Sequence, residues 1–176
     1  FREIVLTGIH LGAYGLDLAP KRDLLELVDA IAAAGFVTRL RIGSLEPNEV
    51  SDGLISSMAG SPVICPHLHL PLQSGSAAVL AAMGREYTPA FIADLVHQVV
   101  AKVADISIGF DVIAGFPGES DADHAVTCRL IESLPIAYLH VFPYSSRPGT
   151  AAAAMPGHLP PAVVKQRAEE LRRLGE

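Results

Sequence analysis

The residues 111–119, DVIAGFPGE, are the stretch of this 176-residue sequence most typical of a ligand-binding turn. They follow an apolar run and precede a helical pattern. This predicts a buried strand, a tight turn at Gly115 and Gly118, and a helix whose first turn contains Glu119. Ligands bind at the carboxyl ends of parallel strands, because turn backbone and helix N-termini present N–H groups there. The stretch therefore predicts a ligand site, although a plain strand-to-helix turn has the same pattern.

Polar and glycine residues also follow the other predicted strands. The five exit loops are residues 8–15, 44–46, 73–76, 115–119 and 144–150. In parallel strands joined by helices these loops gather on one rim, and the active face of an α/β barrel is built from such a rim. We expect the chemistry of the protein to lie there.

The strands and helices that must position these loops alternate along the sequence, as the spacing of apolar residues changes from that of a strand to that of a helix. Strand patterns cover residues 3–7, 39–42, 67–72, 106–113 and 137–142, and the principal helical patterns cover 23–35, 48–58, 88–103, 120–133 and 161–174. Asp23 and Asn48 are the expected starts of the first two helices, and Phe91 is expected on the buried face of the third. The alternation predicts right-handed βαβ units in the α/β class, with a parallel sheet that is open or closed into a barrel.

Composition restricts the classes of partner. With 13 basic against 19 acidic residues, charge alone does not favour binding to nucleic acid. No apolar run approaches the roughly 20 residues of a membrane span, and no signal-peptide pattern is seen, so we expect a cytoplasmic protein with no membrane partner. Cys65 and Cys128, the only cysteines, lie far apart without a CxxC pattern, which predicts buried free thiols.

Histidines and lysines give weaker signals. His67 and His69 form an HxH pair on one strand but have no third ligand at a typical spacing, so we expect polar groups of the barrel interior and no metal site. The three lysines lie away from the predicted strand ends, which argues against an aldolase with a Schiff-base lysine. They are Lys21, Lys102 and Lys165.

Six motifs in order carry a resemblance to a known family. They are LTGIHLGAYG, RLRIGSLEP, CPHLHLPLQSGS, MGREYT, DVIAGFPGE and YLHVFPYSSRPGTAAAAMP. In this order the chain resembles the radical S-adenosylmethionine methylthiotransferases from Glu3 to Leu174. The HVFPYSSRPGTAA stretch is most similar to the branch that acts on threonylcarbamoyladenosine in tRNA. The isopentenyladenosine branch and the ribosomal-protein branch are alternatives, as is a nucleotide-binding α/β module without radical chemistry.

The resemblance implies a reaction and its cofactors. In the family, a 4Fe-4S cluster on a CxxxCxxC loop binds S-adenosylmethionine and cleaves it to a radical that abstracts the hydrogen at adenine C2, where a methylthio group is inserted. Partners are tRNA and an electron donor that reduces the cluster. This sequence has no CxxxCxxC. We therefore expect residues 1–176 to be a partial radical barrel without catalytic residues and without activity of its own. The cluster loop and the N-terminal domain are expected upstream of Phe1, and an RNA-binding domain beyond Glu176.

The resemblance also implies site residues. The cofactor-binding residues are expected to be Gly8, Ser44, Glu46, Gln73, Ser74, Ser76, Arg85, Ile113, Gly115 and Glu119. The rim residues expected to contact an extruded tRNA base are Tyr144, Ser145 and Arg147. Ser44 and Glu46 would engage the methionyl ammonium of the cofactor, and Arg85 its carboxylate. Helix capping, loop packing and a solvated surface arginine are the structural alternatives.

Overall fold

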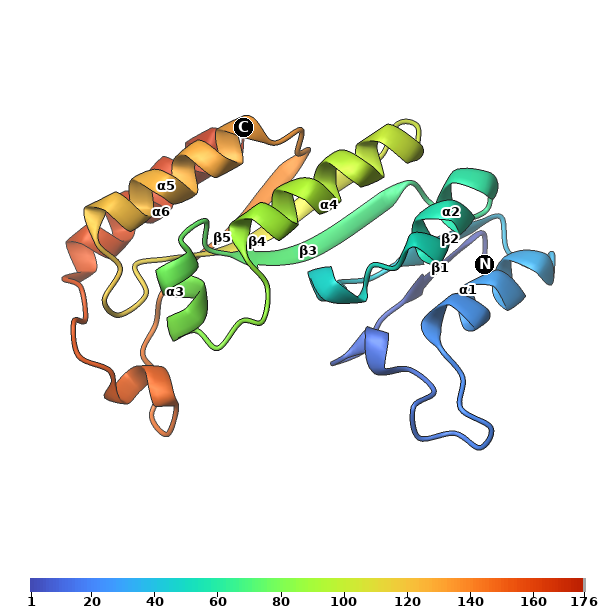
Figure 1. Ribbon diagram of the computed structural model, residues 1–176, viewed down its shortest axis with the longest axis horizontal. Coiled ribbons are helices and arrows are strands. Elements are labelled where there is room, and N and C mark those ends of the chain that lie inside the picture. Colours follow the sequence, from blue (N-terminus) through green and yellow to red (C-terminus); the bar gives the residue numbers. More distant parts are fainter. Residues whose placement is uncertain (176) are drawn as a thin grey trace. The chain divides into compact units, whose positions relative to one another are not determined.

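A computed structural model describes residues 1–175 of the chain (Figure 1). The chain divides into two compact units, and each contains parallel strands and helices. The first unit is Phe1–Pro71 with His97–Ile108, and the second is Leu72–Val96 with Gly109–Glu176. None of the helices within the described part of the chain is long and apolar enough to cross a membrane.

In the first unit, strand β1 (Glu3–Leu6) pairs in parallel with β2 (Arg39–Ile42), with Glu3 opposite Arg39 and Leu6 opposite Ile42. Helix α1 (Leu24–Ala33) joins the two strands. The predicted start of α1 is confirmed, because Asp23 Oδ1 accepts a hydrogen bond of 2.8 Å from Glu26 N. Arg39 Nε lies 2.7 Å from Glu3 Oε2, and this ion pair links the first residues of β1 and β2.

The predicted start of the second helix is wrong. Pro47–Glu49 forms a short 3-10 turn, and α2 (Asp52–Gly60) begins only after it. Ser51 is the N-cap residue, since its hydroxyl accepts a hydrogen bond of 3.1 Å from Leu54 N. Asn48 lies in the middle of the 3-10 turn and is exposed. A serine three residues further on therefore performs the capping that the sequence pattern assigned to Asn48.

The second sheet has the strand order β3-β4-β5, formed by β3 (His67–Gln73), β4 (Ser107–Ala114) and β5 (Tyr138–Pro143). β4 and β5 run parallel, with Asp111 opposite His140 and Ile113 opposite Phe142. Along β4, Val112 and Ala114 are buried while Asp111 and Ile113 are half-buried. The alternation places these two half-buried side chains on the opposite sheet face from their buried neighbours.

Along the chain, four α-helices of the described residues accompany the strands of this sheet. They are α3 (Ala77–Ala82), α4 (Pro89–Lys102), α5 (Asp121–Ser133) and α6 (Pro161–Leu174). In the second unit, α5 and α6 lie side by side, and α6 packs against β5 (Figure 1). The expected burial of Phe91 on α4 is wrong: Phe91 is 41% exposed, and the adjacent Ile92 is buried in its place. Ile92 continues the buried row through Val96 and Val99, at helical spacing.

The predicted α/β class is confirmed. All five expected strands form, and β1–β2 and β4–β5 are parallel pairs. The strands make one sheet of two and one of three strands, which is consistent with part of a barrel.

Candidate cofactor and substrate pockets

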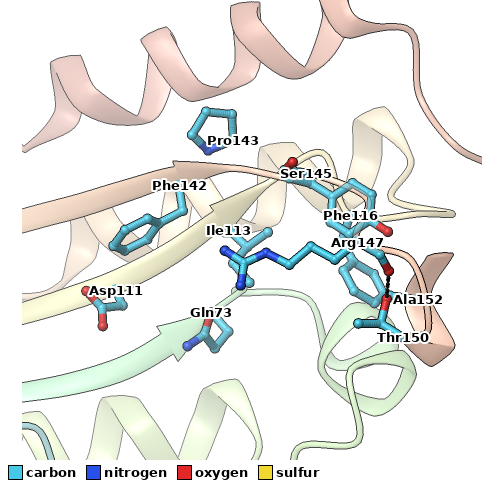
Figure 2. Close-up of a pocket in the computed structure, with 11 residues that line it drawn as sticks. Gln73, Asp111, Ile113, Phe116, Phe142, Pro143, Ser145, Arg147, Thr150 and Ala152 are labelled. Atoms are coloured by element: carbon cyan, nitrogen blue, oxygen red, sulfur yellow. Dashed lines mark hydrogen bonds between the residues drawn. The ribbon is translucent and has the colours of Figure 1, made fainter.

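A pocket of about 440 Å³ lies at the carboxyl ends of β4 and β5 in the second unit (Figure 2). Its walls come from the half-buried face of the sheet and from the loop that follows β5. The lining residues include Gln73, Asp111, Ile113, Phe116, Phe142, Tyr144, Ser145, Arg147 and Thr150. The pocket thus brings together five of the residues expected from the sequence: Gln73, Ile113, Tyr144, Ser145 and Arg147.

The lining of this pocket is mainly apolar with a few polar groups. Ile113 and the aromatic rings of Phe116 and Phe142 supply apolar surface, and Figure 2 shows Arg147 extending across the pocket toward Gln73. Arg147 is exposed, and no carboxylate of the described residues lies within ion-pair distance of it. Its backbone is held by Thr150, whose hydroxyl donates a 2.8 Å hydrogen bond to Arg147 O. An apolar pocket with a small number of polar groups is typical of sites for small organic ligands.

Two pocket residues, Gln73 and Tyr144, are held in place by the surrounding structure in different ways. Gln73 ends β3 with a φ of 61°, a left-handed conformation that non-glycine residues rarely adopt. Backbone strain of this kind is concentrated at functional sites in proteins. The ring of Tyr144 packs between Phe116 and His158, with centroid distances of 5.6 and 5.8 Å. These contacts fix the loop after β5 against the turn after β4.

The glycine turn after β4 forms as predicted. Gly115 and Gly118 have φ angles of 77° and 82°, which favour glycine. The expected position of Glu119 is wrong by a short distance: α5 starts at Asp121 with Ser120 as its N-cap, so Glu119 precedes the helix. Glu119 is 4% exposed and its carboxylate accepts a 3.0 Å hydrogen bond from Gly115 N. The buried Glu119 carboxylate therefore stabilises the turn by binding its backbone at Gly115.

Arg167 is the partner of Glu119 that the sequence analysis missed. It is buried on α6, and its Nη1 donates to Glu119 Oε1 at 2.7 Å and to the backbone Glu119 O at 3.0 Å. Its Nη2 donates to Asp121 Oδ1 at 2.5 Å. No local signal marks this arginine, because it lies 48 residues from Glu119 and in a helix rich in exposed charges.

Ser74 and Ser76 are buried and bonded within the protein. Ser76 caps α3 and donates a 2.6 Å hydrogen bond to Asp123 Oδ1, and Ser74 Oγ lies 3.3 Å from Thr127 Oγ1. Hydrogen bonds from Ser120 and Ser76 lower the pKa of Asp123. The contacts of both serines are therefore those of helix capping and local packing. Their role in cofactor binding stays a prediction.

A second, polar pocket of about 300 Å³ lies in the first unit. It is lined by Gly8, His10, Ser44 and Glu46, which the sequence placed in exit loops, and by Glu49, which it did not single out. His10 Nε2 contacts Glu49 Oε1, and Glu46 N donates to Glu49 Oε2 at 3.2 Å. The two glutamates make this pocket suitable for a cationic group.

Arg85 lies outside both pockets. It is half-buried in the loop between α3 and α4, where its N–H donates a 2.9 Å hydrogen bond to Leu80 O. Its role as a carboxylate partner of a cofactor stays a prediction.

The side chains fit the two implied cofactors differently. The apolar walls of Ile113, Phe116 and Phe142 suit the adenine ring of S-adenosylmethionine, and Gln73 and Asp111 are hydrogen-bonding groups for ribose hydroxyls. A 4Fe-4S cluster requires several clustered thiolates. Cys65 and Cys128 are free and belong to different units, so the cysteines of this chain do not form a cluster site.

The sequence is similar to two kinds of tRNA-modifying enzyme. It is 38% identical over 172 residues to a threonylcarbamoyladenosine tRNA methylthiotransferase of Thermotoga maritima, covering 98% of this chain and 39% of that protein. It is also 38% identical over 174 residues to a tRNA-2-methylthio-N(6)-dimethylallyladenosine synthase of Thermobifida fusca, covering 99% of this chain and 35% of that protein. The chain thus spans little more than a third of these relatives. No protein-family model matches it.

Solved structures show the same fold at low sequence identity. The coproporphyrinogen III oxidase HemN of Escherichia coli, described as a radical SAM enzyme, matches 84% of this chain and 36% of its own, with a TM-score of 0.68 at 18% identity. Elp3 of Methanocaldococcus infernus matches 85% of this chain and 38% of its own, with a TM-score of 0.55 at 14% identity. The resemblance in the six motifs is confirmed: along nearly its whole length, the chain is homologous to one segment of the tRNA methylthiotransferases, with the fold of radical S-adenosylmethionine enzymes.

Proposed function

We propose that the chain is the central part of a transferase that attaches a methylthio group to C2 of an N6-modified adenosine in tRNA. The observation that carries this proposal is the pocket in the second unit, which is lined by residues from two of the family-like motifs. One wall holds Ile113 and Phe116, from the strand and turn of the DVIAGFPGE stretch. The other wall holds Tyr144 and Arg147, from the YSSRPGT loop. The names of the relatives supply the reaction class.

The pocket is proposed to hold the adenosyl part of S-adenosylmethionine. Its volume of about 440 Å³ lies within the usual range for small-molecule sites. Ile113 and Phe142 would contact the base, and Gln73 and Asp111 would bind the ribose. When bound at a reduced 4Fe-4S cluster, S-adenosylmethionine supplies the one-electron chemistry that activates adenine C2. The cluster ligands are assigned to other parts of the full-length enzyme, and the electron donor to a separate partner.

The polar pocket of the first unit is proposed to bind an ammonium group. Glu46 and Glu49 line it with carboxylates, and Ser44 adds a hydroxyl. Carboxylates favour a primary ammonium, because their hydrogen bonds with it are charge-assisted. The lining thus supports the expected role of Ser44 and Glu46 as partners of an ammonium group.

The proposed substrate is threonylcarbamoyladenosine, and isopentenyladenosine (dimethylallyladenosine) is the second candidate. Both kinds of relative are 38% identical to this chain, so overall identity favours neither substrate. The HVFPYSSRPGTAA stretch supports the first. Arg147 would stack on an extruded base or bind a phosphate, since its planar guanidinium is exposed at the pocket. Ser145 lines the same wall and supplies a hydroxyl.

Binding and cleavage of S-adenosylmethionine test the pocket assignment. The full-length protein would be reconstituted with iron and sulfide under anaerobic conditions, reduced, and assayed for 5′-deoxyadenosine by chromatography. We expect wild-type protein to form it, Ile113→Asp to weaken binding of S-adenosylmethionine at least tenfold, and the exposed-site control Val126→Asp to bind as wild type. Binding without any 5′-deoxyadenosine would instead support a nucleotide-binding module without radical chemistry. Equal binding by both variants would contradict the pocket assignment.

A further inference from the structure

We propose that His124 and Cys128 of helix α5 and Glu170 of helix α6 form a binding site for Zn²⁺. One ligand atom from each residue lies within 4.8 Å of the others. Imidazole nitrogen, thiolate sulfur and carboxylate oxygen are the three ligand types that zinc uses in proteins. All three residues belong to the second unit, and none of them lines the pocket described above. The proposal is therefore independent of the proposed function.

The distances between the ligand atoms agree with tetrahedral zinc geometry. With Zn–S of about 2.3 Å and Zn–N of about 2.0 to 2.1 Å, a tetrahedral angle separates sulfur and nitrogen by about 3.5 Å. Cys128 Sγ lies 3.6 Å from His124 Nε2. The same reasoning separates nitrogen and oxygen ligands by about 3.3 Å, and His124 Nε2 lies 3.0 Å from Glu170 Oε2. Both separations from His124 Nε2 are thus close to those of a zinc site, and all three ligand atoms lie within 4.8 Å of one another.

The other nitrogen of His124 faces a buried carboxylate. His124 Nδ1 lies 3.7 Å from Glu119 Oε1, and Glu119 is held in place by Arg167. Histidine ligands of zinc usually direct their second ring nitrogen to a carboxylate or carbonyl oxygen, which orients the ring. Glu119 takes this position at ion-pair distance, and Nε2 is then the nitrogen directed at Cys128 and Glu170.

The site is accessible from solvent through Glu170. The Glu170 side chain is 47% exposed and that of His124 is 10% exposed, while Cys128 is half-buried. In the metal-free chain, burial and then the nearby glutamates raise the pKa of Cys128 to about 11, so zinc binding would release the thiol proton to solvent. Three protein ligands leave the fourth position for water.

Cobalt substitution tests this site directly. The 176-residue chain, prepared without a histidine tag, would be titrated with Co²⁺, which adopts the same tetrahedral geometry and reports thiolate ligation by a charge-transfer absorption. We expect one equivalent to bind with that absorption, and Zn²⁺ to displace it. Cys128→Ser should abolish the absorption, and Glu170→Gln should weaken Zn²⁺ binding by about 10- to 100-fold or more.

Two matched variants separate this site from unspecific binding. Cys65→Ala removes the other thiol, and Glu169→Gln neutralises the exposed carboxylate next to Glu170. Both should bind Co²⁺ as wild type. Circular dichroism would confirm that each variant is folded, and Glu170→Gln, at an exposed position, keeps the test valid if Cys128→Ser does not fold. Absent binding, binding without a thiolate absorption, or equal Zn²⁺ affinity of wild type and Glu170→Gln would overturn the proposal.

Discussion

Arg167 Nη1 lies 2.7 Å from Glu119 Oε1, and both side chains are almost completely buried. This ion pair joins the last helix to the turn after β4, where the same Glu119 carboxylate accepts the hydrogen bond of Gly115 N. A buried carboxylate requires both a cation and hydrogen-bond donors to offset its loss of solvation. Here Arg167 and Gly115 supply them. The conformation of the glycine turn therefore depends on a residue near the end of the chain.

Removing Arg167 should destabilise the chain strongly. Arg167→Ala leaves the Glu119 carboxylate buried without its cation, which typically costs about 3 to 5 kcal/mol. Urea unfolding would measure the loss. Arg173→Ala, at an exposed position six residues further along the same helix, is the control and should change the free energy of unfolding by less than about 0.5 kcal/mol. A loss below about 1 kcal/mol in Arg167→Ala would show that the buried pair contributes little.

Two alanine substitutions separate backbone strain from packing in the glycine turn. Both Gly115 and Gly118 have positive φ, but a Cβ at Gly115 would lie 2.7 Å from Val164 Cγ2, whereas a Cβ at Gly118 meets nothing within 4 Å. Gly118→Ala should cost about 1 kcal/mol from strain alone, and Gly115→Ala about 1 to 3 kcal/mol more because α6 must shift. Thermal or urea unfolding measures both. Equal losses would mean that α6 does not pack on the turn as the structure has it.

The charge state of His67 should make stability depend on pH. Burial, with repulsion from Arg41 and His69, lowers the pKa of His67 below its usual 6.5. The unfolded chain then binds this proton more readily than the folded chain, so the free energy of unfolding decreases as pH falls below about 6.5. His67→Gln should lose less stability than wild type between about pH 7.5 and 5.5, while the exposed His97→Gln should behave as wild type. The same slope in all three proteins would exclude His67 as the source.

Arg147 should matter for the tRNA substrate more than for stability. Its side chain is exposed at the pocket, so Arg147→Ala should leave unfolding nearly unchanged. Loss of a stacking or phosphate contact costs about 1 to 3 kcal/mol of binding, or roughly 5- to 150-fold in tRNA affinity of the full-length enzyme. Arg147→Lys distinguishes the two contacts. Lysine keeps the positive charge and so should retain a phosphate contact, but it lacks the planar guanidinium and should lose a stacking contact. The exposed Arg129→Ala on α5 is the control. Unchanged tRNA affinity in Arg147→Ala would remove Arg147 from the substrate site.

The order of strands and helices could be predicted from the sequence because it follows from local patterns. The glycines at 115 and 118 identified the turn after β4, and the pattern from Ile106 to Ile113 identified its strand, which the structure has at Ser107–Ala114. Asn48 and Phe91 were misplaced for local reasons as well. A 3-10 turn replaced the first turn of a helix, and the adjacent Ile92 took the buried position.

The parts of the site that could not be predicted depend on contacts between distant residues. Arg167 meets Glu119 across 48 positions, and Glu170 meets His124 across 46. A single sequence does not show which charged face of α6 meets α5. The spacing of His124 and Cys128, four residues apart on one helix face, was the available signal for the zinc site. Grouping of the rim residues was predictable in part, because parallel strands end at one edge of a sheet.

The nucleosides of tRNA give the most direct test of the proposed reaction. The full-length gene would be expressed anaerobically in a host that lacks its own methylthiotransferases, and tRNA nucleosides would be analysed by mass spectrometry. We predict a methylthio derivative of threonylcarbamoyladenosine that is absent from the host without the gene. A methylthio derivative of isopentenyladenosine alone would keep the reaction and change the substrate. No methylthio nucleoside, despite folded protein with its iron-sulfur clusters, would contradict the proposed function.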